Sequence, residues 1–491
     1  MPPTPRSSTA AAAWLLALGL ACDRDSAPGA IDPADDAAPS SAALETEPGS
    51  APSRARTANA DAEGSAGPPA ETAETAESAL PPALERRRAN QALMVYTAPS
   101  FGTDFRGKIP RYRVFEVFEH VEGPGCGGDG WGRVGVAAYA CLQRTEPVSA
   151  PAVPLPEVLP DGLAPFFYAR LQKRGSTKTP TPAPRWRSRQ AMRSGAPPED
   201  HLAPEHDYAF VARRRFRDGR VLVAANDRVV READVHRMRP SAFAGRDLEA
   251  RPVPAGTVPA WSIMWPHAVV RDRPDPEAEV VGRLPLHAEA LAPDEPPTAP
   301  ATRDARWHPV SEPVEGWVEA EQLRWWVPLP PPEGVADDQV WLDVDLGQQM
   351  LALRRGAAIE FVTLVSSGNW KHGTPTGLFR LESKWAYADM RSRPDDSEEA
   401  YYVEGVPWVL YFRGRYALHG TFWHNRFGRR TSHGCINLSA HDARWVYEHT
   451  APTAMPGWLV TYEHARAPGT LLRIRKGKAE PPDRRRPLHG R

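Results

Sequence analysis

The sequence is poor in cysteine, balanced in charge and without a long hydrophobic run. It has 4 Cys among 491 residues, which excludes a disulfide-stapled miniprotein and a zinc ribbon built on paired C-x-x-C knuckles. Its 60 Lys and Arg face 61 Asp and Glu, so the net charge gives no reason to expect a nucleic-acid partner. The apolar run at residues 10–21 is shorter than the ~20 residues that span a bilayer.

The amino terminus has the features of an export signal. The apolar residues 10–21 follow Arg6, and their number suits a signal-peptide core. Cys22 follows directly in LGLAC, which resembles the lipobox of bacterial lipoproteins. Residues 1–22 are therefore predicted to direct export to the periplasm or cell envelope, with Cys22 lipidated and anchoring the protein to a membrane. An ordinary cleaved signal with an incidental cysteine is the alternative.

Proline is abundant, at 54 residues, which is about twice its usual ~5% share. Residues 23–89 are rich in Ala, Pro and acidic side chains and contain few large apolar ones. Such a stretch cannot bury enough surface to offset the entropy lost on ordering. It is predicted to be a disordered linker.

Three β-rich units are predicted before the proline-rich break that follows residue 327. Valines and aromatics at two-residue spacing between Gly and Pro clusters indicate small β barrels at 90–147 and 257–327. Both resemble bacterial SH3-like domains, which could bind cell-wall glycan or peptide. The region 159–250 between them is also β-rich, and its sequence indicates no function.

Cys126 and Cys141 both lie in the first of these units. Two cysteines in one small β unit are predicted to form a disulfide in an oxidising compartment. Two free thiols are the alternative, and either outcome is structural.

Residues 338–465 are predicted to form a separate β-rich domain, and the fold class expected for the whole chain is mainly β. The spacing of Ser439 and Asp442 is that of a capping box, which predicts a short helix directly after it. The basic residues 466–491 are predicted to be a solvated, flexible tail.

Reactive side chains gather in the last third of this domain. Cys435 lies in a glycine-containing turn, and a thiol needs an imidazole within reach to act as a nucleophile at neutral pH. His419 and His433 are the candidate bases. Gly434 lets the backbone approach closely, so that amide N–H groups can face an oxyanion. The set indicates acyl transfer, with a buried structural cysteine as the alternative.

These residues resemble the L,D-transpeptidase (YkuD-type) family. Its signature is a His-Gly pair, a spacer, and then Ser/Thr-His-Gly-Cys followed by a hydrophobic residue and Asn or Arg. His419–Gly420 and residues 432–437, SHGCIN, match it in order and spacing. Residues 373–377, GTPTG, are similar to the segment that precedes the next strand on the family's substrate side. The resemblance runs from Val340 to Tyr462.

The resemblance implies a role for each matched residue. Cys435 would be the nucleophile and His419 the general base, oriented by a backbone carbonyl. His433 would support the thiolate or the oxyanion and is the second candidate for the base, and Gly434 would shape the turn. The substrate side would consist of Gly420, Thr421, Trp423, His424, Ser432 and Asn437, with Arg429 and Arg430 as candidate partners of a carboxylate.

The implied reaction is cysteine acyl transfer on peptidoglycan stem peptides, through a thioester and without a cofactor or metal. The acceptor stays open: an amine would give a cross-link or an anchored protein, and water would give a carboxypeptidase. Two other classes of function also stay open. One is a zinc site built from His419, His424, His433 and Cys435. The other is a wall-binding lipoprotein whose last domain is not catalytic.

Overall fold

The computed structural model describes residues 80–160, 162–171, 182–204, 206–216, 219–294, 307–392, 401–477 and 485. All of them belong to the compact unit Ala70–Arg491. Cys22, the predicted signal and most of the predicted linker lie outside the described residues. Among the described residues, no helix is both long enough and apolar enough to cross a membrane.

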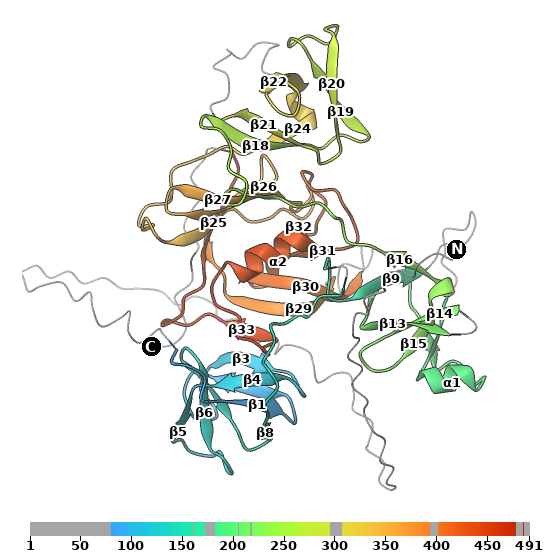
Figure 1. Ribbon diagram of the computed structural model, residues 1–491, viewed down its shortest axis with the longest axis vertical. Coiled ribbons are helices and arrows are strands. Elements are labelled where there is room, and N and C mark those ends of the chain that lie inside the picture. The colour runs from blue at the N-terminus through green and yellow to red at the C-terminus, as the bar shows by residue number, and fades with distance from the viewer. Residues whose placement is uncertain are drawn as a thin grey trace, which may run out of the picture. The chain divides into compact units, whose positions relative to one another are not determined.

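The described chain is mainly β, which confirms the predicted fold class (Figure 1). The first unit is built around a small core that includes Val95, Phe115 and Leu142. A disulfide joins Cys126 to Cys141 in this unit, with a Cα–Cα distance of 5.7 Å. Its strands are β1 (Glu85–Ala89), β2 (Leu93–Tyr96), β3 (Phe105–Ile109), β4 (Val114–Val117), β5 (Glu119–Val121), β6 (Trp131–Gly135), β7 (Ala138–Cys141) and β8 (Thr145–Pro147).

The predicted linker boundary at residue 89 is wrong, because β1 already begins at Glu85. The run ERRRA alternates, and Arg87 points inward with only 3% of its surface exposed. Its guanidinium donates to Thr145 Oγ1 (2.6 Å), to Glu85 and to Asp129. Two of the three partners of Arg87, Thr145 and Asp129, are distant in sequence, so the composition of the segment alone did not indicate this strand.

The intermediate region contains small sheets and one short helix. Two of its strands, β12 and β16, pair with β9 on either side. Its elements are β9 (Phe167–Leu171), β10 (Pro184–Trp186), α1 (Arg189–Arg193), β11 (Asp200–His201), β12 (His206–Phe210), β13 (Ala212–Phe216), β14 (Gly219–Val223), β15 (Val229–Arg231), the 3-10 helix η2 (Glu232–Asp234), β16 (Val235–Met238) and β17 (Arg246–Asp247).

The third unit has one sheet in the order β21-β18-β24 and another in the order β20-β19-β23-β22. Its elements are β18 (Thr257–Ser262), β19 (His267–Arg271), β20 (Val280–Pro285), β21 (Glu289–Pro293), β22 (Trp307–Val310), β23 (Gly316–Glu319), the 3-10 helix η4 (Ala320–Gln322) and β24 (Leu323–Trp325).

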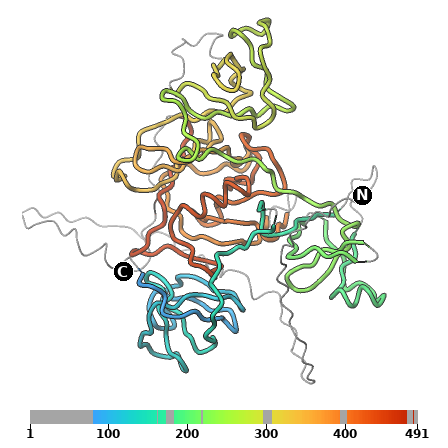
Figure 2. The backbone as a smooth tube through the Cα atoms, viewed as in Figure 1, coloured from blue at the N-terminus to red at the C-terminus, as the bar shows by residue number. Residues whose placement is uncertain are grey.

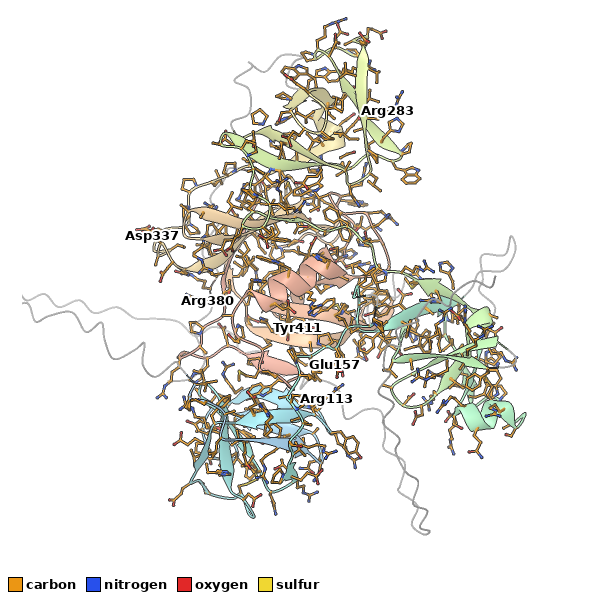
Figure 3. The ribbon with its side chains drawn as sticks, viewed as in Figure 1. Arg113, Glu157, Arg283, Asp337, Arg380 and Tyr411 are labelled. Atoms are coloured by element: carbon orange, nitrogen blue, oxygen red, sulfur yellow. A yellow bond between two sulfur atoms is a disulfide. The ribbon has the colours of Figure 1, made fainter. Side chains whose placement is uncertain are left out.

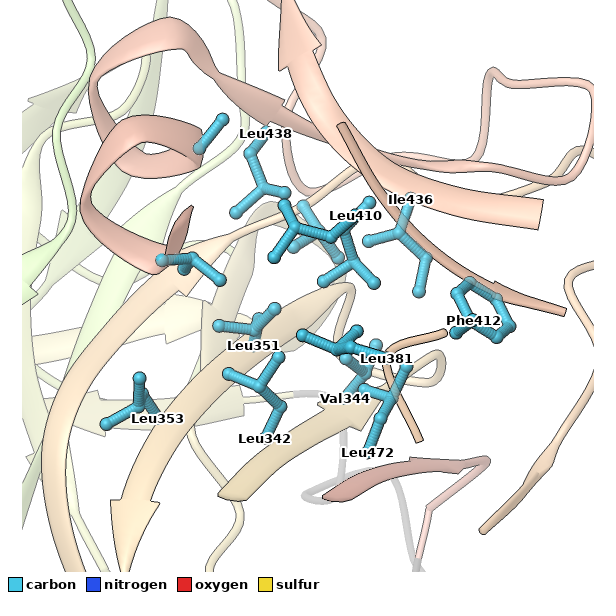
Figure 4. Close-up of a cluster of buried hydrophobic side chains, with 14 of the residues drawn as sticks. Leu342, Val344, Leu351, Leu353, Leu381, Leu410, Phe412, Ile436, Leu438 and Leu472 are labelled. Carbon is cyan, nitrogen blue, oxygen red and sulfur yellow. The ribbon is translucent and has the colours of Figure 1, made fainter. Parts of the chain in front are cut away.

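The carboxy-terminal domain packs two sheets around the largest apolar core of the described chain (Figure 4). Leu342, Leu351 and Leu472 come from the first sheet, and Leu410 and Ile436 from the second. The elements are β25 (Val340–Asp345), β26 (Met350–Arg355), β27 (Ala358–Leu364), β28 (Gly377–Arg380), β29 (Ser383–Arg391), β30 (Tyr402–Arg413), β31 (Tyr416–Thr421), β32 (Ile436–Ser439), α2 (Ala440–Glu448), β33 (Val460–Tyr462) and β34 (Leu471–Arg475).

Helix α2 forms where the capping-box spacing predicted it. Ser439 Oγ accepts a hydrogen bond from the N–H of Asp442 (3.1 Å), as an N-cap does. The helix packs on β30 and β31 (Figure 1), and Ala443 and Val446 are fully buried there. The carboxylate of Asp442 does not close the box, because it accepts from Gly245 N (2.9 Å) and Thr363 Oγ1 (2.5 Å) instead.

The upstream units add strands to the sheets of the carboxy-terminal domain. In the intermediate region, β12 runs parallel to β30 and pairs His206 with Tyr402. In the first unit, β3 pairs with β33 through Gly107 and Thr461, a junction that can be followed in Figure 2. The domain is therefore continuous with its neighbours through backbone hydrogen bonds, which the prediction of separate modules did not include.

The predicted flexible tail is wrong over β34, which lies between β25 and β28 in the six-stranded sheet. Arg473 and Arg475 are at most 1% exposed, and they lie opposite Asp343 and Asp345 in the parallel register with β25. Arg473 donates to both carboxylate oxygens of Asp343 (3.1 and 2.7 Å), and Arg475 donates to the carboxylates of Asp343 (3.0 Å) and Asp345 (2.8 Å). The arginines also donate to backbone carbonyls of the segment before β25.

This buried ion network generates a test of stability. Replacing Asp343 by Ala leaves two buried guanidiniums without their shared carboxylate, which is expected to lower the free energy of unfolding by about 3 to 5 kcal/mol. The control is Glu360→Ala, which removes the partly exposed Arg355–Glu360 pair and should cost about 1 kcal/mol or less. Denaturant unfolding measures both, and equal losses for the two variants would contradict the importance of the network.

Candidate active site

The site is built on two neighbouring parallel strands, β31 and β32. In their register Leu418 lies opposite Ile436, and His419 lies opposite Asn437. Leu418 and Ile436 are both in the main core. Because successive side chains of a strand point to opposite faces, His419 and Asn437 lie on the other face.

Cys435 immediately precedes β32 and belongs to that second face. Its side chain packs with Ala417, Tyr411 and Trp423 in a second apolar cluster, away from the main core. Ala417 is two residues before His419 on the same face of β31. The thiol and the imidazole therefore project from adjacent strands on the same side of the sheet, two residues apart along it.

His419 is held as a neutral imidazole. Only 2% of its surface is exposed, and burial lowers its pKa to about 4. Its Nδ1 lies 3.1 Å from the carbonyl oxygen of Gly420. A carbonyl can only accept, so Nδ1 carries the proton and Nε2 keeps the lone pair that a base needs. A backbone carbonyl thus orients this ring.

Cys435 is half-buried and is the free cysteine of the described residues. Burial raises the pKa of its thiol, while the N–H of Ala417 and the charge of Arg415 act in the opposite direction. Its Sγ lies 3.6 Å from the carbonyl oxygen of Arg415, which can accept the S–H. The resting pair is therefore a thiol beside a neutral imidazole rather than a thiolate and imidazolium.

The turn before Cys435 is rigid. Gly434 has φ +116°, and a Cβ there would lie 2.7 Å from the ring of Tyr416, so only glycine fits. Ser432 Oγ accepts from Gly434 N (3.1 Å) and donates to Cys435 O (2.5 Å). Thr374 Oγ1 donates to Gly434 O (2.8 Å) and accepts from Gly368 N (2.9 Å).

These contacts refine two predictions made from the sequence. The N–H of Gly434 is engaged by Ser432, so it does not face an oxyanion in this state, whereas the N–H of Cys435 has no hydrogen-bond partner among the described residues. Ser432 serves the turn itself. The turn leads into β32, since residues 436–439 pair with β31, and α2 follows that strand.

His433 lies on the exposed side of the turn. Its ring centroid is 4.8 Å from that of His372 and 5.1 Å from that of Tyr401. A supporting role for His433 stays a prediction.

The predicted substrate-side residues fall into two groups. Trp423 is partly buried beside His419, with 5.7 Å between ring centroids. His424 contacts the protein through both ring nitrogens, since Arg426 N donates to Nδ1 (3.1 Å) and the Asn437 amide lies 3.0 Å from Nε2. His424 and Asn437 therefore brace the loop between the strands, whereas the other two predicted residues of β31, Gly420 and Thr421, are fully buried.

Arg429 and Arg430 are exposed side chains that contact backbone carbonyls. Arg429 Nη2 donates to Ile263 O (2.9 Å), and Arg430 Nη2 donates to Leu346 O (3.1 Å). The first contact ties this loop to the third β unit. A contact of either arginine with a substrate carboxylate stays a prediction.

Sequence reasoning missed several residues around the thiol. Tyr411 is on β30 (Figure 3), opposite Ala417 in the register, and Trp385 lies next to it with 6.0 Å between ring centroids. Burial raises the pKa of Tyr411 to about 12, and the charge of a Cys435 thiolate would act in the same direction. The signal available in the sequence was that Tyr411 and Ala417 lie on either side of Gly414 in a strand-like segment.

The zinc alternative finds no support in the geometry. Within the part of the chain that the structure describes, no three His, Cys, Asp or Glu side chains are grouped to hold a metal ion. Nδ1 of His419 and both nitrogens of His424 already contact protein atoms.

Comparison with known proteins identifies this part of the chain. Residues 339–470 match the family model of YkuD, the L,D-transpeptidase catalytic domain. The chain contains a YkuD-type domain. It is also similar to a putative L,D-transpeptidase, YciB, of Bacillus subtilis, with 26% identity over 132 residues, which cover 23% of this chain and 63% of the relative. The chain thus spans less than two thirds of the length of that relative.

Solved structures of low identity also match the chain. An L,D-transpeptidase from Mycobacterium smegmatis is 19% identical, covering 38% of this chain and 90% of the other, with a TM-score of 0.23. A mutant form of an Enterococcus faecium L,D-transpeptidase is 18% identical, covering 28% of this chain and 50% of the other, with a TM-score of 0.22.

The neutral thiol–imidazole pair can be tested by alkylation. The raised pKa of Cys435 predicts that its reaction with iodoacetamide is slower at pH 7 than that of an exposed cysteine, and that its alkaline rise is shifted to higher pH. Intact-protein mass against pH measures the rate, in a Cys22→Ser background so that Cys435 alone reacts. Fast alkylation at pH 5 to 6 would instead show a preformed thiolate–imidazolium pair.

Proposed function

We propose that the YkuD-type domain is a cysteine acyltransferase that acts on peptidoglycan stem peptides. The observation that carries the proposal is the placement of Cys435 and the neutral His419 on one face of paired strands, with Nε2 of His419 left as an acceptor. A buried structural cysteine would not require an imidazole oriented in this way. The family match over residues 339–470 supports this substrate class.

The proposed chemistry begins with proton transfer from Cys435 Sγ to Nε2 of His419. The sulfur then attacks the carbonyl carbon of the third residue of a tetrapeptide stem, forming a C–S bond. The C–N bond to the terminal D-Ala breaks, and the imidazolium returns the proton to the leaving amine. A thioester and free D-Ala result.

The second half-reaction regenerates the free thiol of Cys435. An amine attacks the thioester, His419 takes a proton from it, and the thiolate leaves and is reprotonated. The product is a new amide, either a cross-link between two stems or a protein attached to the wall. If water attacks in place of the amine, the product is a free tripeptide carboxylate.

The environment of the pair suits this sequence of steps. Burial destabilises both the thiolate and the imidazolium, so charge separation is costly until a substrate carbonyl is present to accept the sulfur. We infer that the N–H of Cys435 supports the developing oxyanion, because Ser432 already engages the N–H of Gly434.

Mutation of the pair tests the mechanism. Cys435→Ala should abolish D-Ala release, and His419→Ala should lower the rate by about 10² to 10⁴-fold because the base is lost. His236→Ala, which removes an exposed histidine of β16, is the matched control and should act as the wild type does. Purified tetrapeptide muropeptides are the substrate, and product masses also identify the acceptor. Full activity of Cys435→Ala would refute the mechanism.

We further propose that Cys22 is lipidated and anchors the enzyme in the cell envelope. The mature protein should then begin at Cys22 and partition into detergent, because more than one acyl chain on this cysteine gives stable anchoring. Cys22→Ser removes the attachment point and should release the protein into the soluble fraction. Cell fractionation and the intact mass of the mature chain measure this. A wild-type chain that is soluble and unmodified would refute the anchor.

A further inference from the structure

Trp370 exposes a larger fraction of its surface than any other large apolar side chain of the described residues, at 85%. It belongs to none of the buried apolar clusters, so it contributes nothing to the core. Its flat ring faces solvent, with the ammonium of Lys371 5.5 Å from the ring centroid. Neither the predicted site residues nor the proposed mechanism uses it.

The backbone that carries Trp370 is fixed. Asn369 Oδ1 accepts from the N–H groups of Lys371 and His372, both at 2.9 Å, which closes a tight turn with Trp370 at its tip. Asn369 N donates to Ser432 O (2.9 Å). A Cβ at Gly368 would lie 2.0 Å from His372 O, so the turn closes too tightly for a larger residue.

The same turn is joined to the turn that carries the nucleophile. Gly368 forms a parallel bridge with Ser432, and Thr374 Oγ1 bonds to Gly434 O (2.8 Å). The ring of His372 lies 4.8 Å from that of His433. Trp370 is therefore held at the rim of the site, a few residues from Cys435 along a continuous set of contacts.

A stem peptide would place its sugar only two residues from the carbonyl that reacts with Cys435. When the third residue reacts with Cys435, two residues separate it from the glycan strand, which is about 7 Å of extended chain. Trp370 is two residues from His372, whose carbonyl oxygen would be 3.8 Å from a Cβ on Gly434, the neighbour of Cys435. The indole is thus within reach of the sugar, beyond the peptide.

We propose that Trp370 binds the glycan end of the acyl donor by stacking its indole against a sugar ring. A solvent-facing indole on this fixed backbone offers an apolar surface that matches the C–H face of a pyranose, and only two side-chain torsions are restricted on binding. Trp370 would then determine specificity for stems attached to sugar over free peptides. This inference rests on the proposed function of the domain.

The test compares two substrates, a disaccharide-tetrapeptide and the free tetrapeptide. Trp370→Ala should raise KM for the disaccharide-tetrapeptide about tenfold more than KM for the free peptide, the size expected for losing one buried aromatic contact. The rate at saturation should change little. Because the side chain is exposed, the variant should keep the melting temperature of the wild type.

Trp265→Ala is the matched control, since this tryptophan is 77% exposed on the third β unit and should leave the ratio of the two KM values as in the wild type. Equal changes of Trp370→Ala on both substrates, or no change on either, would overturn the proposal. A wild-type enzyme that releases no D-Ala from either substrate would instead refute the proposed function of the domain.

Discussion

The parallel pairing of β31 with β32 is the constraint on which the site depends. A hairpin cannot join parallel strands, so the chain between them must cross over through a dozen or more residues. Here that crossover runs from the end of β31 at Thr421 to the start of β32 at Ile436. The spacer between the His-Gly pair and the cysteine turn is therefore a geometric requirement of the fold. It also has to be braced, which the contact between His424 and Asn437 does.

Burial favours the uncharged forms of both His419 and Cys435. His419 lies beside Trp423 and has a carbonyl rather than a carboxylate as its partner, so this partner carries no negative charge that would stabilise the protonated imidazole. The same environment disfavours the thiolate of Cys435. In the proposed mechanism, charge separation in this site is therefore delayed until a substrate carbonyl is present, and the dipoles of the turn then face the developing charge.

Local patterns predicted the parts of the fold that local patterns determine. The alternation of β25, the cap at Ser439 and the motif around Cys435 could be recognised because each depends on neighbours in sequence. The role of β34 could not be recognised from the sequence. Its arginines lie in a basic stretch that suggests a solvated tail, and the sequence does not show that the acidic residues of β25 lie opposite them. Strand β26 has apolar residues on both faces for a similar reason, since Leu351 packs in the main core and Met350 packs against the third β unit.

The strand pairings β12–β30 and β3–β33 complete two edges of the sheet that carries the site. The intermediate region covers the edge of β30 and the first unit covers the edge of β33, and open edges invite pairing with other chains. In this protein, strands from outside the segment matched by the family model therefore complete the edges of its sheet. Truncation at its borders would expose these sheet edges, so the isolated segment is expected to pair with other chains more readily than the longer chain does.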